Sequence, residues 1–333
     1  MHKIDLSKFD LRTDLIIEQD IKNLKANKYN YKDIYVDDII IKKNNNLNKK
    51  EGKYVTISFR DITDSTNYLN VLNIFKKELN KIINYLKIKK EDKCLIIGLG
   101  NPEIISDALG SKTLDNIIVT RHLYLINDVD LKYRNVAIIK PNVMGITGID
   151  SFEIIKNIVN EIKPDFVIAI DSLCAIDIRR LNKTIQITTS GITPGSGIGN
   201  ERSELSKDTL GVKVIAIGVP TVVDSSVIVS DTIKYILKKV SYLKTNNKII
   251  DKLKPINKIN YFDIEEELNN NEKKEILGMI GLLNSNELKR LVWEVLSPLE
   301  SNMIVTVKEI DFVIQKLSNL ISEGINKVIH DID

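Results

Sequence analysis

Short apolar segments alternate with segments of helical periodicity in the middle of the chain. Five apolar runs have the length of a β-strand and are separated by polar or glycine-containing turns. All except the fourth are apolar at successive positions, which is typical of strands that are covered on both faces of a sheet. The runs are Cys94–Leu99, Val136–Ile139, Phe166–Ile170, Thr184–Thr188 and Val214–Val219.

The segments around these runs have the spacing of amphipathic helices. In Tyr68–Leu86, apolar residues recur every three or four positions. Asp150–Ile162 begins with a capping residue and has Glu153 three positions later, which is the spacing of a capping box. Thr306 and Glu309 have the same spacing before the last helix. The other predicted helices are Ser226–Val240, Lys273–Val295 and Val307–Ile329.

Alternating strands and helices predict an α/β fold with a mostly parallel sheet and helices on both faces. Two further β-like runs, Asp33–Ile41 and Tyr54–Arg60, precede this core, and the polar segment Lys244–Asn271 is predicted to be a connection. We expect a single domain whose core spans about residues 93–244, with a helical segment at about 272–330.

Composition narrows the class of protein. The hydrophobic fraction of 43% is normal for a soluble domain, and the net charge of +3 gives no reason to expect nucleic acid or a membrane as partner. The mixed charges of Met1–Leu15 do not resemble a secretory signal, and we find no membrane-spanning segment. Only two cysteines are present, so we expect a protein of the reducing cytoplasm.

Two aspartates are the best catalytic candidates. Ligand sites of open α/β sheets lie beyond the carboxyl ends of the strands. Gly98–Asn101 leads from one strand end to Asp107, and Asp171 follows another strand. Two close carboxylates do not both ionise readily, so one donates a proton while the other acts as a base. This division suits peptide hydrolysis, although an aspartate at a strand end is also common as a helix cap or turn residue.

Other interpretations stay open from the residues alone. The glycine-rich loop Gly191–Asn200 could hold a phosphate, but it lacks the ending of a P-loop and fits a tight turn near substrate equally well. Cys174 could be a nucleophile, with His122 as the only histidine in the core. We expect instead that His122 ends the helix after Asp107 and that Cys94 fills a buried strand position.

Ordered blocks along the chain resemble the germination protease family of spore-forming bacteria. Two blocks match this family near the carboxyl ends of predicted strands, and others extend the match over nearly the whole chain. These blocks are Arg12–Leu15, Gly98–Asn101, Asp107–Gly110, Val119–Leu123, Val143–Gly148, Pro164–Asp171, Pro194–Gly197, Leu210–Gly211, Val214–Asp224, Glu294–Pro298 and Val305–Glu309.

The resemblance implies an atypical aspartic endopeptidase without a metal or other cofactor. It implies a three-layer α/β/α fold related to hydrogenase-maturation proteases, and catalytic aspartates at Asp107 and Asp171. The implied substrates are small acid-soluble spore proteins, and the implied site of action is the spore core. Family members are tetrameric zymogens that remove a short propeptide. The expected substrate-loop residues are Gly98, Gly100, Asn101, Gly195, Ser196 and Gly197.

The sequence departs from the family pattern at one position of interest. Thr189 stands where the family usually has an aspartate, so an acidic group cannot be essential there or this enzyme is altered. Two alternative functions stay open. One is a maturation-type peptidase that recognises a metal bound in its substrate, with Glu103 and His122 as the available ligands; the other is a non-catalytic binding module of the same fold.

Residues 1–18, here called the leader, contain a segment with the layout of a family cleavage motif. In Thr13–Glu18, a hydroxyl residue and an acid precede an apolar pair, and a second acid follows three residues beyond Leu15. We therefore expect self-cleavage between Asp14 and Leu15, which makes residues 1–14 the propeptide and 15–333 the peptidase domain.

Overall fold

The computed structural model describes residues 14–18, 26–43, 49–130, 132–194, 203–245, 267–296 and 303–332. These residues divide into two compact units. The core unit lies within Arg12–Val222 and Thr306–Asp333, and the helical unit lies within Val223–Val305. Among the described helices, none is long and apolar enough to cross a membrane.

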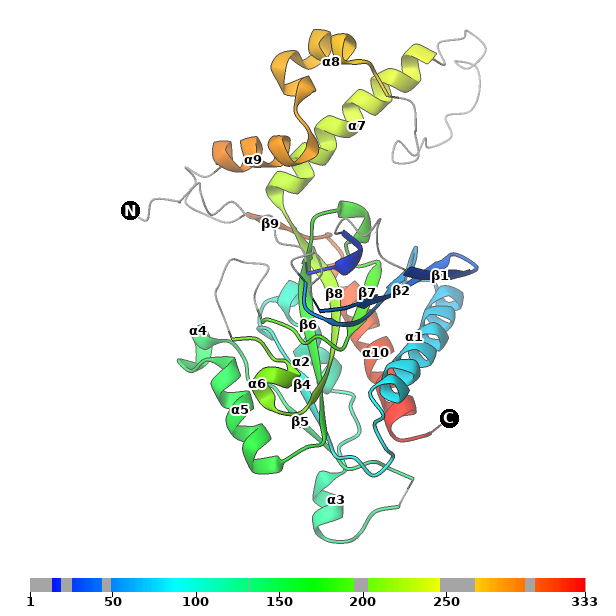
Figure 1. Ribbon diagram of the computed structural model, residues 1–333, viewed down its shortest axis with the longest axis vertical. Helices are drawn as coiled ribbons and strands as arrows, with labels where there is room; N and C mark the ends of the chain where they lie inside the picture. Colours follow the sequence, from blue (N-terminus) through cyan, green and yellow to red (C-terminus); the bar gives the residue numbers. More distant parts are fainter. Residues whose placement is uncertain are drawn as a thin grey trace. The chain divides into compact units, whose positions relative to one another are not determined.

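A mixed sheet forms the centre of the core unit (Figure 1). Its strand order in the described chain is β1-β2-β3-β7-β8-β6-β4-β5. The strand β4 pairs in parallel with β5 and β6, whereas β1, β2, β3, β7 and β8 form an antiparallel series. The strands are β1 (Ala26–Tyr31), β2 (Ile34–Ile41), β3 (Gly52–Ser58), β4 (Cys94–Gly98), β5 (Val136–Ile139), β6 (Phe166–Ala175), β7 (Thr184–Thr188) and β8 (Lys213–Asp224).

The prediction of an α/β fold is confirmed, but the prediction of a mostly parallel sheet is wrong. The antiparallel strands β1, β2 and β3 join the sheet through β7, which itself runs antiparallel to β3 and β8. The sequence pattern shows which segments are strands but not which partner each strand takes. The strand β1 was not expected, because an edge strand of sequence Ala-Asn-Lys-Tyr-Asn-Tyr has no apolar pattern.

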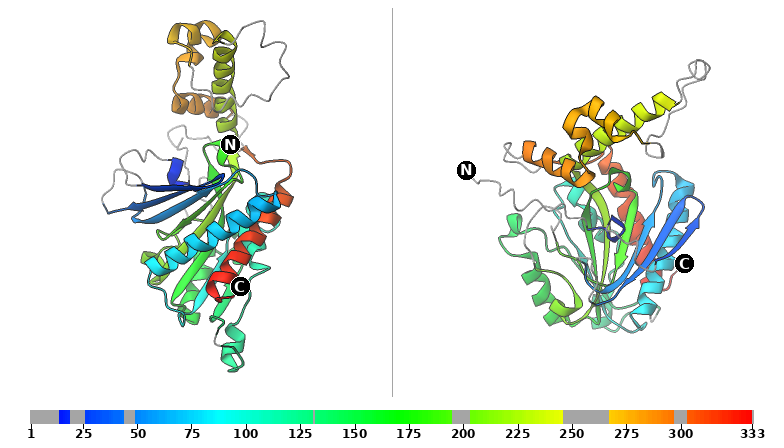
Figure 2. Two further views of the ribbon diagram at one scale, coloured as in Figure 1. Left: turned by 90° about the vertical axis from the view of Figure 1, so that its right-hand side faces the viewer. Right: turned by 45° about the horizontal axis from the view of Figure 1, so that its top comes forward.

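Helices cover both faces of the sheet. On one face, α1 (Ser65–Tyr85), α2 (Leu109–Leu114) and α10 (Ile310–Ile329) bury apolar side chains against the strands, and Figure 2 shows α1 and α10 side by side. On the other face, α5 (Ser151–Ile162) packs against alternate residues of β4 and β6. The shorter helices of this unit are α3 (Arg121–Leu125), α4 (Met144–Thr147) and α6 (Lys207–Leu210).

Helix boundaries test the capping predictions. Asp150 caps α5 as expected, since its side chain accepts from the backbone N–H of Phe152 at 2.8 Å. The capping box expected at Thr306 is absent, because α10 begins after Glu309, which makes no side-chain cap. The hydroxyl of Thr306 instead donates to the carbonyl of Thr221 in β8, at 2.7 Å. Thr306 therefore ties the chain to the sheet before the helix begins.

The helical unit contains the rest of the described helices. They are α7 (Ser225–Thr245), α8 (Asn270–Leu277), the short 3-10 helix η8 (Gly278–Leu282) and α9 (Ser285–Leu296). The expected single helix Lys273–Val295 is thus broken. Gly278 has φ +59°, a conformation that favours glycine, and it ends α8. The two-residue strand β9 (Ile304–Val305) pairs with Val223 and Asp224.

Candidate active site

The turn after β4 places Asp107 by close backbone contacts. Asp107 ends the 3-10 helix η3 (Ile105–Asp107), and its carboxylate accepts from the N–H of Asn101 at 2.7 Å. Gly100 has φ +91°, and a Cβ added there would lie 2.0 Å from the carbonyl oxygen of Asp107. Only glycine therefore lets this turn close around Asp107. The half-buried Asp107 is held by the same Gly-Leu-Gly-Asn motif that the sequence singled out.

Asp171 lies on the neighbouring strand. The pairing of β4 with β6 ends at Gly98 and Ile170, and the N–H of Leu99 donates to the carbonyl of Ile170 at 2.9 Å. Asp171 is 4% exposed, and its carboxylate accepts from the N–H of Ser172. It was expected to follow the strand end, but β6 continues to Ala175. Asp171 therefore stands within β6, where the shorter β4 ends.

Two contacts bring the segment of Asp107 close to β6 and β8. Gly110, in the first turn of α2, lies so close to β6 that an added Cβ would be 2.4 Å from the carbonyl oxygen of Ile170. The buried Thr221 of β8 donates its hydroxyl to the carbonyl of Ser106 in η3, at 2.6 Å. The structure thus places Asp107, in η3, and Asp171, in β6 beside the end of β4, at the same edge of the sheet.

His122 lies at the other edge of the sheet. It is in α3 and not at the end of the helix that follows Asp107, because that helix, α2, ends at Leu114. The N–H of Thr120, just before α3, donates to the carbonyl of Val136 at the start of β5. Since β4 and β5 are parallel, α3 lies near their amino ends. His122 is therefore separated from Glu103 and Cys174 by the length of the strands, and neither the cysteine–histidine pair nor the Glu103–His122 metal site forms.

The other residues singled out from the sequence lie away from the two aspartates or outside the described residues. Cys94 is buried in β4 as expected, and burial raises the pKa of its thiol. The hydroxyl of Thr189 accepts from the N–H of Lys53 at 3.0 Å and extends the pairing of β3 with β7. Gly195, Ser196 and Gly197 lie outside the described residues. Within the described ranges, no group of three His, Cys, Asp or Glu side chains is arranged to hold a metal ion.

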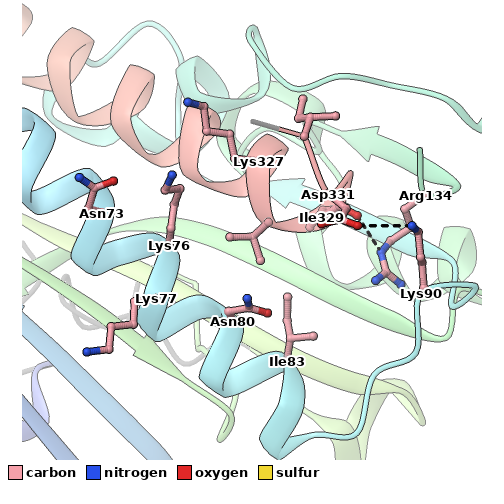
Figure 3. Close-up of a pocket in the computed structure, with 12 residues that line it drawn as sticks. Asn73, Lys76, Lys77, Asn80, Ile83, Lys90, Arg134, Lys327, Ile329 and Asp331 are labelled. Atoms are coloured by element: carbon pink, nitrogen blue, oxygen red, sulfur yellow. Dashed lines mark hydrogen bonds and ion pairs between the residues drawn. The ribbon is translucent and has the colours of Figure 1, made fainter. Parts of the chain in front are cut away.

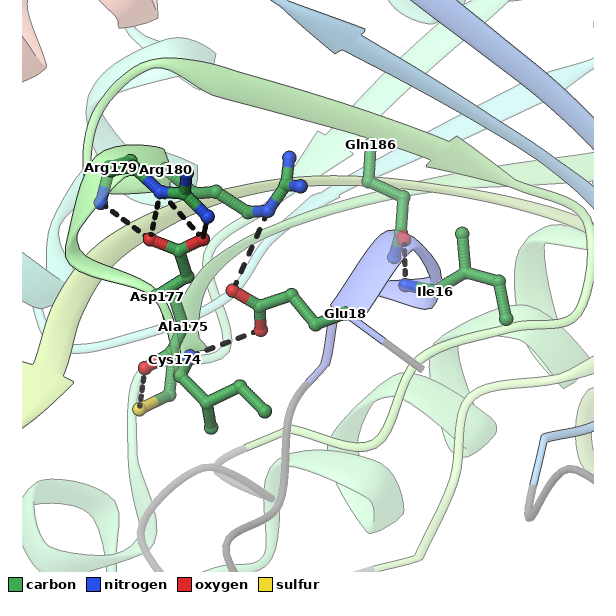
Figure 4. Close-up of polar contacts among 9 residues, drawn as sticks. Ile16, Glu18, Cys174, Ala175, Asp177, Arg179, Arg180 and Gln186 are labelled. Carbon is green, nitrogen blue, oxygen red and sulfur yellow. Dashed lines mark hydrogen bonds and ion pairs between the residues drawn. The ribbon is translucent and has the colours of Figure 1, made fainter. Parts of the chain in front are cut away.

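The described part of the leader is held along the far end of β6 (Figure 4). Asp14 accepts at its carboxylate from the N–H of Cys174, at 3.0 Å. The side-chain amide of Gln186 in β7 spans Leu15: it donates to the carbonyl of Asp14 at 3.0 Å and accepts from the N–H of Ile16 at 2.8 Å. Gln186 thus binds the leader backbone in the way that a neighbouring strand would.

The second acid of the leader is held by the next part of β6. Glu18 is the last residue of the 3-10 helix η2 (Ile16–Glu18). Its carboxylate accepts from the N–H of Ile176 at 3.0 Å. Arg180 Nε lies 3.8 Å from the other carboxylate oxygen of Glu18. Figure 4 shows the contact between Glu18 and Arg180. Both acids of the leader are therefore bound by groups from the β6–β7 segment.

Lys49 and an apolar pocket complete the leader contacts. Lys49 Nζ lies 3.5 Å from the carbonyl oxygen of Asp14. Burial lowers the pKa of Lys49, and the carboxylates of Asp14 and Glu18 partly offset this. Leu15 and Ile16 are fully buried, and Ile16 packs against side chains of β2 and β3. No sequence pattern pointed to Gln186, Lys49 or Arg180, since each is more than thirty positions from the leader.

A separate basic pocket of about 500 Å³ lies where α1 meets the end of α10 (Figure 3). Its cations are Lys76, Lys77, Lys90, Lys327 and Arg134. Several have partners: Lys90 pairs with Asp331, Lys327 pairs with Glu323, and the guanidinium of Arg134 donates to backbone carbonyls. This pocket lies apart from the two aspartates, and carboxylates pair with two of its cations, Lys90 and Lys327.

Comparisons with known proteins place the chain among the peptidases. The family model described as germination protease matches residues 8–332. A germination protease of Bacillus cereus (strain AH187) is 41% identical, with 98% of this chain and 95% of the relative covered. A germination protease of Bacillus licheniformis is 39% identical over 99% of this chain and 96% of the relative. The chain belongs to the germination protease family, as its sequence blocks predicted.

Proposed function

We propose that this protein is an aspartic-type endopeptidase that begins the breakdown of small acid-soluble spore proteins during germination. The observation that carries the proposal is the placement of Asp107 and Asp171 at one edge of the sheet: Asp107 is in the turn that follows β4, and Asp171 is in β6 next to the end of β4. The family supports a peptidase of spore germination, and this pair of carboxylates supports the catalytic type.

The chemistry follows from what two neighbouring carboxyl groups can do. One carboxylate takes a proton from water as the water attacks the scissile carbonyl carbon. The other, protonated, donates a hydrogen bond to the carbonyl oxygen and then a proton to the leaving amine. The N–H of Asn101 orients Asp107, and the N–H of Ser172 orients Asp171. No cofactor enters this scheme.

Three further features belong to the proposal. Residues 1–14 act as a propeptide that the enzyme removes by cutting between Asp14 and Leu15, and residues 15–333 act as the peptidase domain. The working form is a homotetramer inside the spore. The fold relation to hydrogenase-maturation proteases is proposed as well, supported by helices on both faces of the sheet.

The test is cleavage of a purified small acid-soluble spore protein. Asp107→Asn and Asp171→Asn should each lower kcat/KM by several orders of magnitude while the circular dichroism spectrum stays unchanged. His122→Ala and Cys174→Ala are the matched controls, because His122 lies at the other edge of the sheet and alanine keeps the N–H of residue 174 that donates to Asp14. Full activity of Asp107→Asn would overturn the dyad.

A further inference from the structure

The basic pocket where α1 meets the end of α10 brings together cations from four segments of the core unit (Figure 3). They are Lys76 and Lys77 of α1, Lys90 before β4, Arg134 before β5 and Lys327 of α10. Among the described residues, Asp331 is the one acid that lines the pocket. Two of the cations precede the amino ends of β4 and β5, whereas Asp107 follows the carboxyl end of β4. The pocket is therefore separate from the proposed peptidase site.

Arg134 is a buried cation that forms no ion pair within the described residues. It is 6% exposed, and its Nε donates to the carbonyl of Ile329 at 3.3 Å. Nη1 donates to the carbonyls of Lys89 and Asp92, and no acceptor in the described chain bonds Nη2. Burial lowers the pKa of Arg134, against the effect of nearby groups that include Asp92 and Glu91. Because a buried cation without a bound counter-charge is costly, this pocket favours an anion.

The lysines of the pocket are available to such an anion. Lys90 Nζ lies 3.4 Å from a carboxylate oxygen of Asp331, whose side chain is 80% exposed. Lys327 pairs with Glu323 one helical turn away. Pairs of this kind, which water reaches, contribute little to stability, so an anion can replace the acid. Lys76 is partly buried, pairs with no acid of the described chain and extends toward α10 in Figure 3.

A phosphate group suits this arrangement better than a carboxylate does. Its terminal oxygens are arranged as a tetrahedron, so they accept from donors that approach from several sides, as the donors of α1, α10 and the two loops do here. The volume of about 500 Å³ exceeds what a phosphate ion needs. Ile83, Val328 and Ile332 supply apolar surface in the same pocket. A phosphate that carries a small organic body fills both parts.

We propose that the basic pocket binds a phosphate monoester, whose phosphate group accepts hydrogen bonds from Arg134 Nη2 and Lys76 Nζ. Ile83 and Ile332 contact its organic body. The ligand touches α1, α10 and the segment before β5, so it holds the end of α10 to the core and stabilises the folded chain. This site contains no residue of the leader, of η3 or of β6, and it does not depend on the proposed function.

Titration calorimetry of the full chain tests the pocket with phenyl phosphate as the probe. At constant ionic strength, we expect saturable binding that is at least about tenfold tighter than binding of inorganic phosphate or benzoate. The N–H of His330, which donates to Asn326 in the last turn of α10, should exchange more slowly with the ligand bound. Unchanged exchange without saturable heat would overturn the proposal. Equal binding of inorganic phosphate or of benzoate would overturn the choice of a phosphate monoester.

Two neighbouring lysines separate a site from a general effect of charge. Lys76→Gln should weaken binding of phenyl phosphate about tenfold. Lys77→Gln is the matched control, because Lys77 Nζ lies 5.5 Å from the ring centre of Tyr29 and extends away from α10 in Figure 3. It should change the affinity by less than about twofold. Equal losses in the two variants would contradict the assigned site.

Arg134→Lys tests the guanidinium itself. Lysine keeps the charge but loses the planar set of donors, so we expect weaker binding of phenyl phosphate than in the unaltered chain. Because Arg134 also holds backbone carbonyls, circular dichroism must show that this variant folds. Unaltered affinity in a folded Arg134→Lys would contradict the role of Arg134. Should the variant not fold, the comparison of Lys76→Gln with Lys77→Gln decides.

Discussion

The peptide bond between Asp14 and Leu15 combines a polarised carbonyl with a buried neighbour. The carbonyl of Asp14 accepts from Gln186 and lies 3.5 Å from Lys49 Nζ, and Leu15 is fully buried. An unrelated protease needs an exposed, extendable segment, so it reaches this bond only after the leader opens. The proposed self-cleavage therefore also requires Leu15 to move before a catalytic group reaches this bond.

Replacing Asp14 tests this at the level of one residue. Asp14→Ala removes the carboxylate that accepts from Cys174, and we expect it to slow conversion of the precursor at least tenfold. The same chain supplied without residues 1–14 should be fully active. Conversion is followed by electrophoresis, and the new N-terminus is identified by sequencing.

Asp33→Ala is the control for Asp14→Ala, since Asp33 is an exposed acid in the turn between β1 and β2. It should leave conversion unchanged. A new N-terminus other than Leu15 would contradict the proposed site. Equal conversion in a chain with both Asp107 and Asp171 replaced would show that another protease does the cutting.

Single residues explain which parts of the site the sequence could predict. Asp107 and Asp171 stood out because they follow apolar strands that the pattern marks clearly, and the structure confirms those strands. Gln186 did not stand out, because it lies in the middle of β7 and its function depends on a partner 170 positions away. Contacts of this kind depend on tertiary folding and leave no local pattern.

At the level of elements, strands covered on both faces were predicted best. β5 and β7 have the predicted bounds, and β4 ends one residue earlier than expected. β6 and β8 are longer than predicted: β6 was expected to end before Asp171, and β8 was expected to end before Pro220. Those extra residues matter for function: the extension of β6 supplies the N–H groups that bind the leader.

The end of α10 is attached to the core through a buried histidine. His330 is 1% exposed, its Nδ1 accepts from the N–H of Arg134 at 3.2 Å, and its Nε2 lies 3.0 Å from the carbonyl oxygen of Ile118. The neutral ring satisfies both contacts, with Nε2 as the donor. Burial lowers the pKa of His330, and the nearby Arg134 guanidinium lowers it further, while the bond to Ile118 opposes the shift.

This attachment predicts a loss of stability in mild acid. As pH falls below the unfolded value near 6.5, the unfolded chain takes up a proton at this histidine before the folded chain does. The contribution of His330 is therefore complete above pH 6.5 and is lost as pH falls to the folded pKa. Its slope approaches about 1.4 kcal/mol per pH unit at most.

The measurement is the free energy of unfolding in urea between pH 5.5 and 7.5. His330→Gln removes the titrating group, so it should flatten this part of the profile, although it also lowers stability overall. His122→Ala serves as the control, and its profile should keep the slope of the unaltered protein. Parallel profiles for the unaltered protein and His330→Gln would contradict the assigned role.

At the level of the whole molecule, the helical unit exposes large apolar side chains. Met279 is 74% exposed, Val295 is 68% exposed and Leu243 is 52% exposed. Contiguous exposed apolar surface is typical of sites that contact another protein chain. In the proposed tetramer, these side chains would contact the helical unit of a second copy of the chain.

Light scattering at micromolar concentrations should show a tetramer. Met279→Asp together with Val295→Asp should shift the protein to smaller species, because a charge in an apolar contact loses its hydration without gaining a partner. Leu125→Asp is a matched control: Leu125 is 67% exposed, but it belongs to α3 of the core unit, so its replacement should leave the assembly unchanged. A monomer across the concentration range would rule out the tetramer. If Leu125→Asp alone dissociated the protein, the contact would lie on the core unit, and the apolar residues of the helical unit would serve another partner.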